Sequence, residues 1–157
     1  MGLNRVAAPA LAALLLLTSC GHEDGALSGE VTRGGVSVRA ELTGNRLAVT
    51  FAPQRRGFHV YSVDLPEGGV QGLGVATKVQ LSDGLVSTGE ARADRPVRQL
   101  SYPSLHLTLP VYPDGPVTVR QAVRRTDGRP RLQVTYAACS ESLCLAPVRA
   151  LEVPLGD

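Results

Sequence analysis

The sequence predicts an all-β protein, an antiparallel β-sandwich. Apolar and polar residues alternate with period two through most of the chain after residue 34, as in strands with one buried face. Turn residues interrupt these runs at intervals of roughly ten residues. No segment carries an apolar stripe at helical spacing. Many short strands without helices favour a sandwich.

The N-terminal residues 1–19 predict the signal peptide of a bacterial lipoprotein. Arg5 precedes an apolar run, residues 11–17, that is too short to span a bilayer. Small residues then precede Cys20, which resembles the lipobox, the motif whose cysteine is lipidated and becomes the mature N-terminus. An ordinary secretory signal with a chance cysteine is the alternative. We therefore expect an extracytoplasmic, membrane-anchored protein with a lipid on Cys20.

The segment between the lipid and the domain, residues 20–33, is predicted to be a tether because it begins polar and rich in glycine. A first edge strand is the alternative. The domain is then expected to span residues 34–157. With 16 Lys and Arg against 14 Asp and Glu, the chain offers no electrostatic case for nucleic acid or an anionic membrane as partner.

Alternating runs predict the strands of the first half at residues 36–42, 47–53, 58–63 and 75–81. Turns at 43–46 and 66–69 separate them. In the third run, Phe58 and Val60 are expected on one face, with His59 and Tyr61 on the other. Residues 82–103 are polar and irregular and predict no strand.

The second half predicts strands at residues 105–111, 117–121, 132–136 and 147–153. Residues 125–130 contain Asp-Gly and predict a hairpin-type connection between the second and third of these strands. His106 is out of phase with its leucine neighbours and is expected to face solvent.

Cys139 and Cys144 are the only cysteines besides Cys20. Outside the cytosol they can form a disulfide. As a staple, it would close a very small loop and stabilise by only about 2 kcal/mol. As a redox switch, it would need a reachable sulfur. No helix N-terminus is evident to lower a thiol pKa, and Glu141 would tend to raise one. The spacing alone leaves both readings open.

Three motifs resemble a known family, the N-terminal periplasmic domain of the thiol:disulfide interchange protein DsbD. The most specific is Tyr136-Ala-Ala-Cys-Ser-Glu-Ser-Leu-Cys-Leu-Ala-Pro147. The others are Gly57-Phe-His-Val-Tyr61 and Leu107-Thr-Leu-Pro-Val111. Their order and spacing agree with the family over roughly residues 35–155.

The resemblance implies an immunoglobulin-like fold and thiol–disulfide exchange with thioredoxin-like extracytoplasmic proteins as electron donor and acceptor. It assigns the mixed disulfide to Cys144 and its resolution to Cys139. It also implies that the residues around the pair line the site, namely Tyr61, Phe58, His59, Tyr136 and Pro147. No cofactor is implied.

Two features depart from the family. The family shields its cysteines with a cap loop that carries an aromatic residue, whereas the corresponding residues 94–98 contain none, and Tyr102 is the candidate to replace it. The transmembrane and thioredoxin-like parts of the family protein have no counterpart in this sequence, so the electron donor is expected to be a separate protein.

Two other functions compete with exchange. One is a lipid-anchored β-sandwich binding module with a purely structural disulfide. The other is a metal-binding lipoprotein, in which His59 or His106 would join the cysteines, since thiolate and imidazole suit copper(I) or zinc. We expect no metal, and the protein is interpreted first as a thiol–disulfide oxidoreductase.

Overall fold

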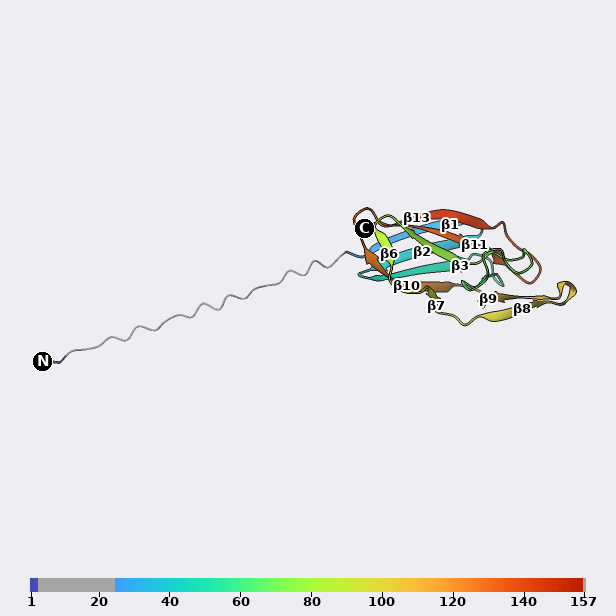
Figure 1. The fold of residues 1–157 in the computed structure, drawn as a ribbon, viewed down its shortest axis with the longest axis horizontal. Coiled ribbons are helices and arrows are strands. Elements are labelled where there is room, and N and C mark those ends of the chain that lie inside the picture. The colour runs from blue at the N-terminus through green and yellow to red at the C-terminus, as the bar shows by residue number, and fades with distance from the viewer. Residues whose placement is uncertain (3–24, 157) are drawn as a thin grey trace.

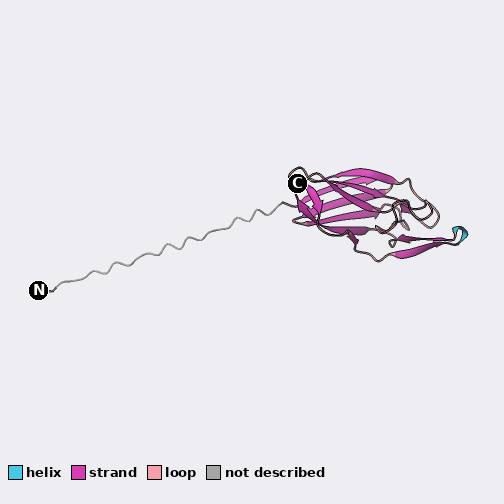
Figure 2. Cartoon of the chain, viewed as in Figure 1, coloured by secondary structure: helices cyan, strands magenta, loops and turns pink. Residues whose placement is uncertain are grey.

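The computed structural model describes residues 1–2 and 25–156, and residues 25–156 form an antiparallel all-β sandwich (Figure 1). This confirms the predicted fold class. The described residues contain no α-helix, only the short 3-10 turn η1 (Pro103–Leu105), as Figure 2 shows. Accordingly, no helix in this part of the chain could cross a membrane. Cys20 and most of the predicted signal peptide lie outside the described residues.

The larger sheet brings together strands from both halves of the chain. Its order is β1 (Leu27–Arg33), β2 (Val36–Thr43), β3 (Arg46–Pro53), β10 (Val117–Arg125) and β6 (Leu85–Ser87), with β7 (Arg92–Ala93) also paired to β10. The alternation in β2 separates its faces as predicted, because Val36, Val38, Ala40 and Leu42 are all fully buried. Burial of each of these valine and leucine side chains stabilises the folded state by about 1.5–3 kcal/mol.

The second sheet covers the inner face of the first. It has the order β13 (Val148–Pro154), β11 (Arg131–Tyr136) and β5 (Lys78–Ser82). Leu132, Val134 and Tyr136 of β11 are fully buried in the main core. There the Tyr136 ring meets Phe51 of β3 edge to face, with 5.5 Å between the ring centroids.

Two small ribbons complete the fold. One pairs β4 (His59–Val60) with β12 (Ala138–Cys139), and the other pairs β8 (Arg98–Tyr102) with β9 (Leu107–Val111). Figure 1 shows the β8–β9 ribbon projecting at one end of the sandwich. A bridge between Tyr61 and Val111 joins the two ribbons. A second, smaller apolar cluster lies between them and includes Tyr61, Leu107, Leu109, Val111, Ala137 and Cys139.

The predicted tether 20–33 is wrong over its last seven residues, which form β1. β1 pairs antiparallel with β2 along its whole length, from Leu27 opposite Leu42 to Arg33 opposite Val36. Leu27 and Val31 pack on the main core. The edge-strand alternative is therefore correct for residues 27–33. The sequence did not favour it because the apolar residues of this segment are few, although they are regularly spaced.

Two further predictions about strands need correction. Residues 82–103 hold the strands β6, β7 and β8, which are too short and polar to show a period. In the run 58–63 the predicted two-faced alternation is absent, since residues 58–62 are all buried. Those residues are covered on both sides, by the main core and by the smaller cluster.

The predicted hairpin at residues 125–130 is also wrong. β10 pairs with β3, β6 and β7, whereas β11 pairs with β13 and β5, so the connection crosses from one sheet to the other. Backbone hydrogen bonds tie it to the β5–β6 turn, from the Thr126 N–H to the Gly84 carbonyl and from the Arg131 N–H to the Asp83 carbonyl.

Candidate functional site

Cys139 and Cys144 form a disulfide at the end of β12. The four residues between them make a tight turn, in which the Ser140 N–H donates to the Leu143 carbonyl at 2.7 Å. The Ser140 hydroxyl also accepts a hydrogen bond from the Leu143 N–H at 3.1 Å. This turn brings the two Cα atoms to 4.1 Å. The short spacing in the sequence is therefore sufficient to form the pair.

The two sulfur-bearing residues differ sharply in exposure. Cys139 is 1% exposed and belongs to the smaller apolar cluster. Cys144 is exposed in the loop beyond it. An incoming thiolate can reach a disulfide only through an accessible sulfur. Of the two residues, Cys144 is thus the one open to an incoming thiolate.

The Tyr61 hydroxyl lies against both sulfurs. Its oxygen is 3.2 Å from Cys139 Sγ and 4.0 Å from Cys144 Sγ. Tyr61 is itself 3% exposed, and burial, followed by the nearby Tyr102 phenol, raises the pKa of Tyr61 to about 12. The hydroxyl therefore stays protonated and can donate a hydrogen bond to a thiolate formed on Cys139.

A cavity of about 330 Å³ opens beside the disulfide. Its lining joins Tyr61 and both cysteines to the loop 72–75 and to Pro147. Gly74 has a φ of +84°, and a Cβ there would lie 3.3 Å from the Tyr61 ring, so glycine lets this loop close over the tyrosine. Leu73, which lines the cavity, is 42% exposed, and Leu143, next to Cys144 in the turn, is 50% exposed.

Behind Cys139, a buried histidine is held by two charged residues. His59 is opposite Cys139 in the β4–β12 ribbon and is fully buried. Its Nδ1 lies 3.1 Å from Asp114 Oδ1 and 3.3 Å from Arg98 Nη2. Arg98 Nη2 also contacts Asp114 Oδ1 at 3.1 Å. Burial lowers the pKa of His59, although the hydrogen bond to Asp114 opposes this.

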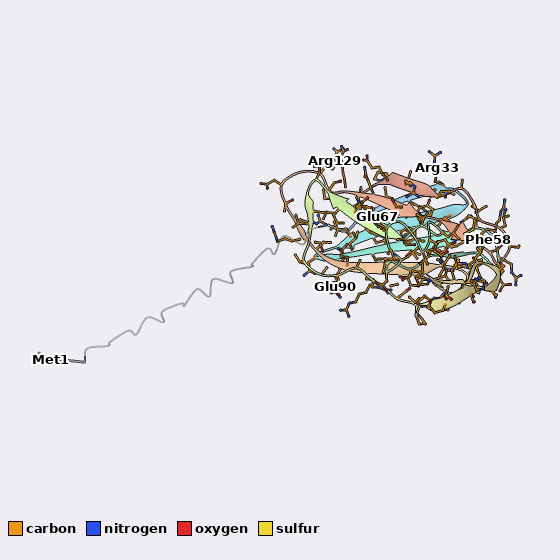
Figure 3. The ribbon with its side chains drawn as sticks, turned by 45° about the vertical axis from the view of Figure 1, so that its right-hand side comes forward. Met1, Arg33, Phe58, Glu67, Glu90 and Arg129 are labelled. Carbon is orange, nitrogen blue, oxygen red and sulfur yellow. A yellow bond between two sulfur atoms is a disulfide. The ribbon has the colours of Figure 1, made fainter. Side chains whose placement is uncertain are left out.

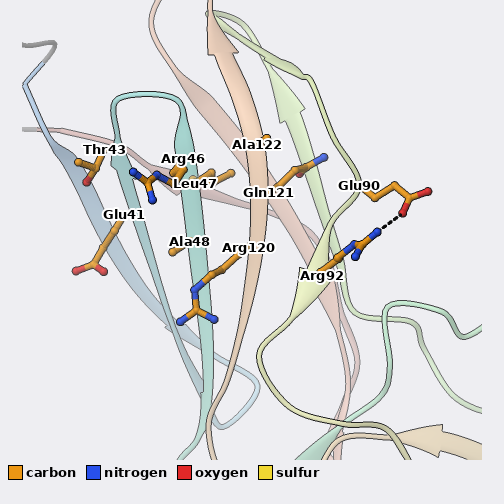
Figure 4. Close-up of a pocket in the computed structure, with 10 residues that line it drawn as sticks. All are labelled: Glu41, Thr43, Arg46, Leu47, Ala48, Glu90, Arg92, Arg120, Gln121 and Ala122. Carbon is orange, nitrogen blue, oxygen red and sulfur yellow. Dashed lines mark hydrogen bonds and ion pairs between the residues drawn. The ribbon is translucent and has the colours of Figure 1, made fainter.

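A larger cavity, of about 590 Å³, is found on the outward face of the large sheet (Figure 4). Its lining contains neither cysteine nor histidine. Two of its arginines form ion pairs with carboxylates, Arg92 with Glu90 at 3.3 Å and Arg120 with Asp94 at 3.4 Å. The disulfide region is the better candidate site because it alone combines a cavity with a reactive bond.

The structure brings together only part of the predicted site. Tyr61 and Pro147 line the cavity, and His59 pairs with Cys139. Phe58 and Tyr136 were expected to line it too, but they belong to the main core. Figure 3 shows Phe58 at the end of the sandwich, and the Arg55 guanidinium stacks over its ring at 5.9 Å.

Sequence reasoning missed Asp114 and Arg98. They are 55 and 39 residues from His59, and only the folded chain joins them. No local sequence pattern indicates that either residue belongs to the site. Tyr102, the candidate replacement for the cap aromatic, packs against the smaller cluster that contains Tyr61 and Cys139. The predicted cap segment 94–98 does not line the disulfide cavity.

No family model matches the chain, and no curated protein is significantly similar to it. The resemblance to the DsbD domain therefore remains a prediction from the three motifs. Within residues 1–2 and 25–156, no group of three or more His, Cys, Asp or Glu side chains could hold a metal ion. His106 is exposed on the turn before β9, as predicted.

Proposed function

We propose that the protein is a thiol–disulfide exchange domain that carries electrons between thioredoxin-like extracytoplasmic proteins. The observation that carries this proposal is the unequal exposure of the pair, with Cys144 open and Cys139 buried against the Tyr61 hydroxyl. A structural staple needs no such asymmetry, and one that closes so short a loop stabilises little.

The exchange runs in two steps. A partner thiolate attacks Cys144 Sγ, the Cys139–Cys144 bond breaks, and Cys139 leaves with the electron pair as a thiolate. The second partner thiolate then attacks the partner sulfur of the mixed disulfide and releases Cys144. The partner is oxidised and the domain is reduced by two electrons. The same steps in reverse pass the electrons to an acceptor disulfide.

The environment of the pair supports both steps. Tyr61 can donate to the departing Cys139 thiolate, because its hydroxyl is already 3.2 Å from that sulfur. The exposed Leu73 and Leu143 give a docked protein apolar surface next to Cys144.

We propose the immunoglobulin-like assignment and the lipid anchor at Cys20 as parts of the same function. Mass spectrometry of the mature N-terminus tests the anchor.

Trapping the mixed disulfide tests the exchange. Cys139→Ala leaves Cys144 free and removes the resolving sulfur, so a thioredoxin-like envelope protein should accumulate in a covalent complex that reductant dissolves. Cys144→Ala is the matched control and should trap nothing, because Cys139 is buried. Absence of any complex with Cys139→Ala would contradict the proposal.

The reduction potential of the pair separates exchange from a structural bridge. Equilibration with glutathione should place it between about −270 and about −120 mV, the range of exchange proteins. A potential below about −300 mV would instead indicate a structural disulfide in a binding module.

A further inference from the structure

Exchange in the direction that reoxidises the pair requires Cys139 to lose a proton. After Cys144 has attacked an acceptor disulfide, Cys139 must attack Cys144 Sγ as a thiolate. Cys139 is 1% exposed, and burial in apolar surroundings disfavours the thiolate. Water has little access to its proton. This step therefore needs a proton acceptor inside the protein, and the following inference rests on the proposed exchange function.

His59 is the titratable side chain directly across the ribbon from Cys139. Opposed residues of antiparallel strands project to the same face, with Cβ atoms about 4.5–5.5 Å apart. Tyr61, two residues further along the chain, projects to that face as well, and its ring meets the imidazole edge to face with 6.4 Å between centroids. The imidazole, the phenol and the sulfur thus share one buried face.

The shorter of the two Nδ1 contacts of His59, the one to Asp114, favours the tautomer with the proton on Nδ1. If Nδ1 carries the proton, it donates to Asp114 Oδ1 at 3.1 Å, and Arg98 donates to the same oxygen. If Nδ1 were unprotonated, Arg98 Nη2 could donate to it at 3.3 Å, but Nδ1 would face the Asp114 carboxylate oxygen at the shorter 3.1 Å with no proton between the two acceptors. The first arrangement leaves Nε2 with a free lone pair. Nε2 is buried and has no hydrogen-bond partner in the part of the chain that the structure describes.

A buried nitrogen without a partner is costly and calls for an explanation. In the disulfide form Cys139 Sγ carries no proton and is bonded towards Cys144, so it has nothing to donate. In the reduced form the Cys139 thiol is free to rotate, and its S–H is the kind of donor that His59 Nε2 lacks. The order nucleophile, imidazole and carboxylate is the arrangement by which proteins activate a weak nucleophile.

We propose that His59 is the base that accepts the Cys139 proton when the mixed disulfide at Cys144 is resolved, with Asp114 positioning the ring. The proton moves from Cys139 Sγ to His59 Nε2. The Cys139 thiolate attacks Cys144 Sγ, the Cys139–Cys144 bond forms, and the bond from Cys144 to the partner breaks. The partner sulfur leaves with the electron pair and takes up a proton, and His59 returns to neutral by releasing its own.

The charges around the ring agree with this role. Burial lowers the pKa of His59, Arg98 on β8 lowers it further, and Asp114 and Glu141 raise it. The neighbouring phenol of Tyr61, whose pKa burial raises to about 12, is uncharged at neutral pH. The ring is therefore neutral and ready to accept a proton at neutral pH, and the imidazolium formed in the step is stabilised by Asp114.

The test measures disulfide closure in the reduced full chain with excess dithiobis(nitrobenzoate). Cys144 reacts first and releases one thionitrobenzoate, and attack by Cys139 then releases the second. In the wild type the second phase should be nearly independent of pH between about pH 6.5 and about pH 8, because the thiol and its base together hold one proton. In His59→Gln it should slow about a hundredfold near neutrality. It should also rise about tenfold per pH unit, as for an unassisted thiol below its pKa.

The first phase is the internal control and should be unchanged, as should both phases in His106→Gln, whose imidazole is exposed. A second phase in His59→Gln that keeps the shallow wild-type pH profile would overturn the proposal, even if it were slower. Should that variant not fold, Asp114→Asn replaces it, because Asp114 is half-exposed. A slower second phase with a normal first phase then supports the proposal, and two wild-type phases overturn it.

A failure of this test can be distinguished from a failure of the proposed function. Partner trapping through Cys144 in Cys139→Ala does not involve His59 as a base. If trapping fails while His59→Gln alters the second phase, the exchange function is wrong and the base assignment stands for the isolated pair. If trapping succeeds while His59→Gln behaves as the wild type, only the base assignment is wrong.

Discussion

At the scale of residues, two buried tyrosines have similar pKa shifts but differ in the groups that their hydroxyls contact. Burial raises the pKa of Tyr61 and of Tyr136 to about 12. The Tyr136 hydroxyl donates to the Arg33 carbonyl at 2.9 Å and closes the main core. The Tyr61 hydroxyl reaches the disulfide instead. The contact of the Tyr136 hydroxyl is structural, whereas the Tyr61 hydroxyl lies where it can donate a hydrogen bond to a cysteine sulfur.

Tyr61→Phe and Tyr136→Phe form a matched pair of variants. Each should lower the free energy of unfolding of the oxidised protein by about 0.5–1.5 kcal/mol, measured in urea. Only Tyr61→Phe should slow reduction by dithiothreitol, by roughly tenfold, because the departing Cys139 thiolate loses a hydrogen bond of the charged kind. Equal reduction rates in the two variants would remove Tyr61 from the exchange mechanism.

His59 should also leave a mark on stability. Its pKa is lowered in the folded protein by burial, so the unfolded chain binds the proton more readily. The contribution of the neutral ring is present above the ordinary histidine pKa of about 6.5 and is lost as the pH falls through the lowered value. Urea unfolding should therefore show falling stability below about pH 6.5.

The matched histidine variants provide the control for this prediction. His59→Gln should flatten the fall, whereas His106→Gln, at an exposed position, should retain it. A fall of unchanged size in His59→Gln would show that other groups cause the acid sensitivity.

Which residues the sequence could reveal depends on how locally they are encoded. The cysteine pair is predictable because only four residues lie between the cysteines and the turn that they form closes on itself. Tyr61 and His59 were found only through the motif that contains them. Arg98 and Asp114 reach His59 from other strands and turns, so no single stretch of sequence carries that cluster.

At the scale of elements, the strands with one buried face were predictable and their partners were not. β2, β3 and β11 alternate in burial as their sequences do. β6, β7 and β8 have at most five residues and owe their conformation to β10 and β9. The crossing at 125–130 has the local sequence of a hairpin, yet pairing with distant strands decides where β10 and β11 lie.

Gly29 tests whether β1 is part of the fold. A Cβ at this position would collide with the Pro154 carbonyl, where β1 passes β13. Gly29→Ala should therefore lower the free energy of unfolding by about 1–3 kcal/mol, as for an overpacked core. Gly25→Ala, whose Cβ would meet nothing within 4 Å, is the control and should leave thermal and urea unfolding unchanged. Equal unfolding of the two variants would favour a tether.

At the scale of the whole molecule, the cysteine pair and the main core occupy separate parts of the structure. The main core lies between the two sheets, whereas Cys139 belongs to the smaller cluster beneath the β8–β9 ribbon. Opening the disulfide releases one short loop and removes no contact between the sheets. The proposed exchange function needs this separation, because the fold must then persist in both redox states.

Reduction should therefore leave the protein folded and only slightly less stable. The disulfide spans a sequence separation of five residues, and a loop of this size stabilises by about 2 kcal/mol in the chain-entropy model. A domain of this size is typically stable by about 5–15 kcal/mol, so most of its stability should remain. Urea unfolding with and without reductant measures the difference, and the slope against urea should be unchanged.

The variant with both Cys139→Ala and Cys144→Ala serves as the control and should match the reduced protein within about 1 kcal/mol, since each substitution replaces a thiol group by hydrogen and removes only one heavy atom. A loss of more than about 5 kcal/mol on reduction would exceed what so short a loop can supply. It would mean that the bond holds the smaller cluster together. The pair would then be a structural staple, and the exchange function would give way to a binding module.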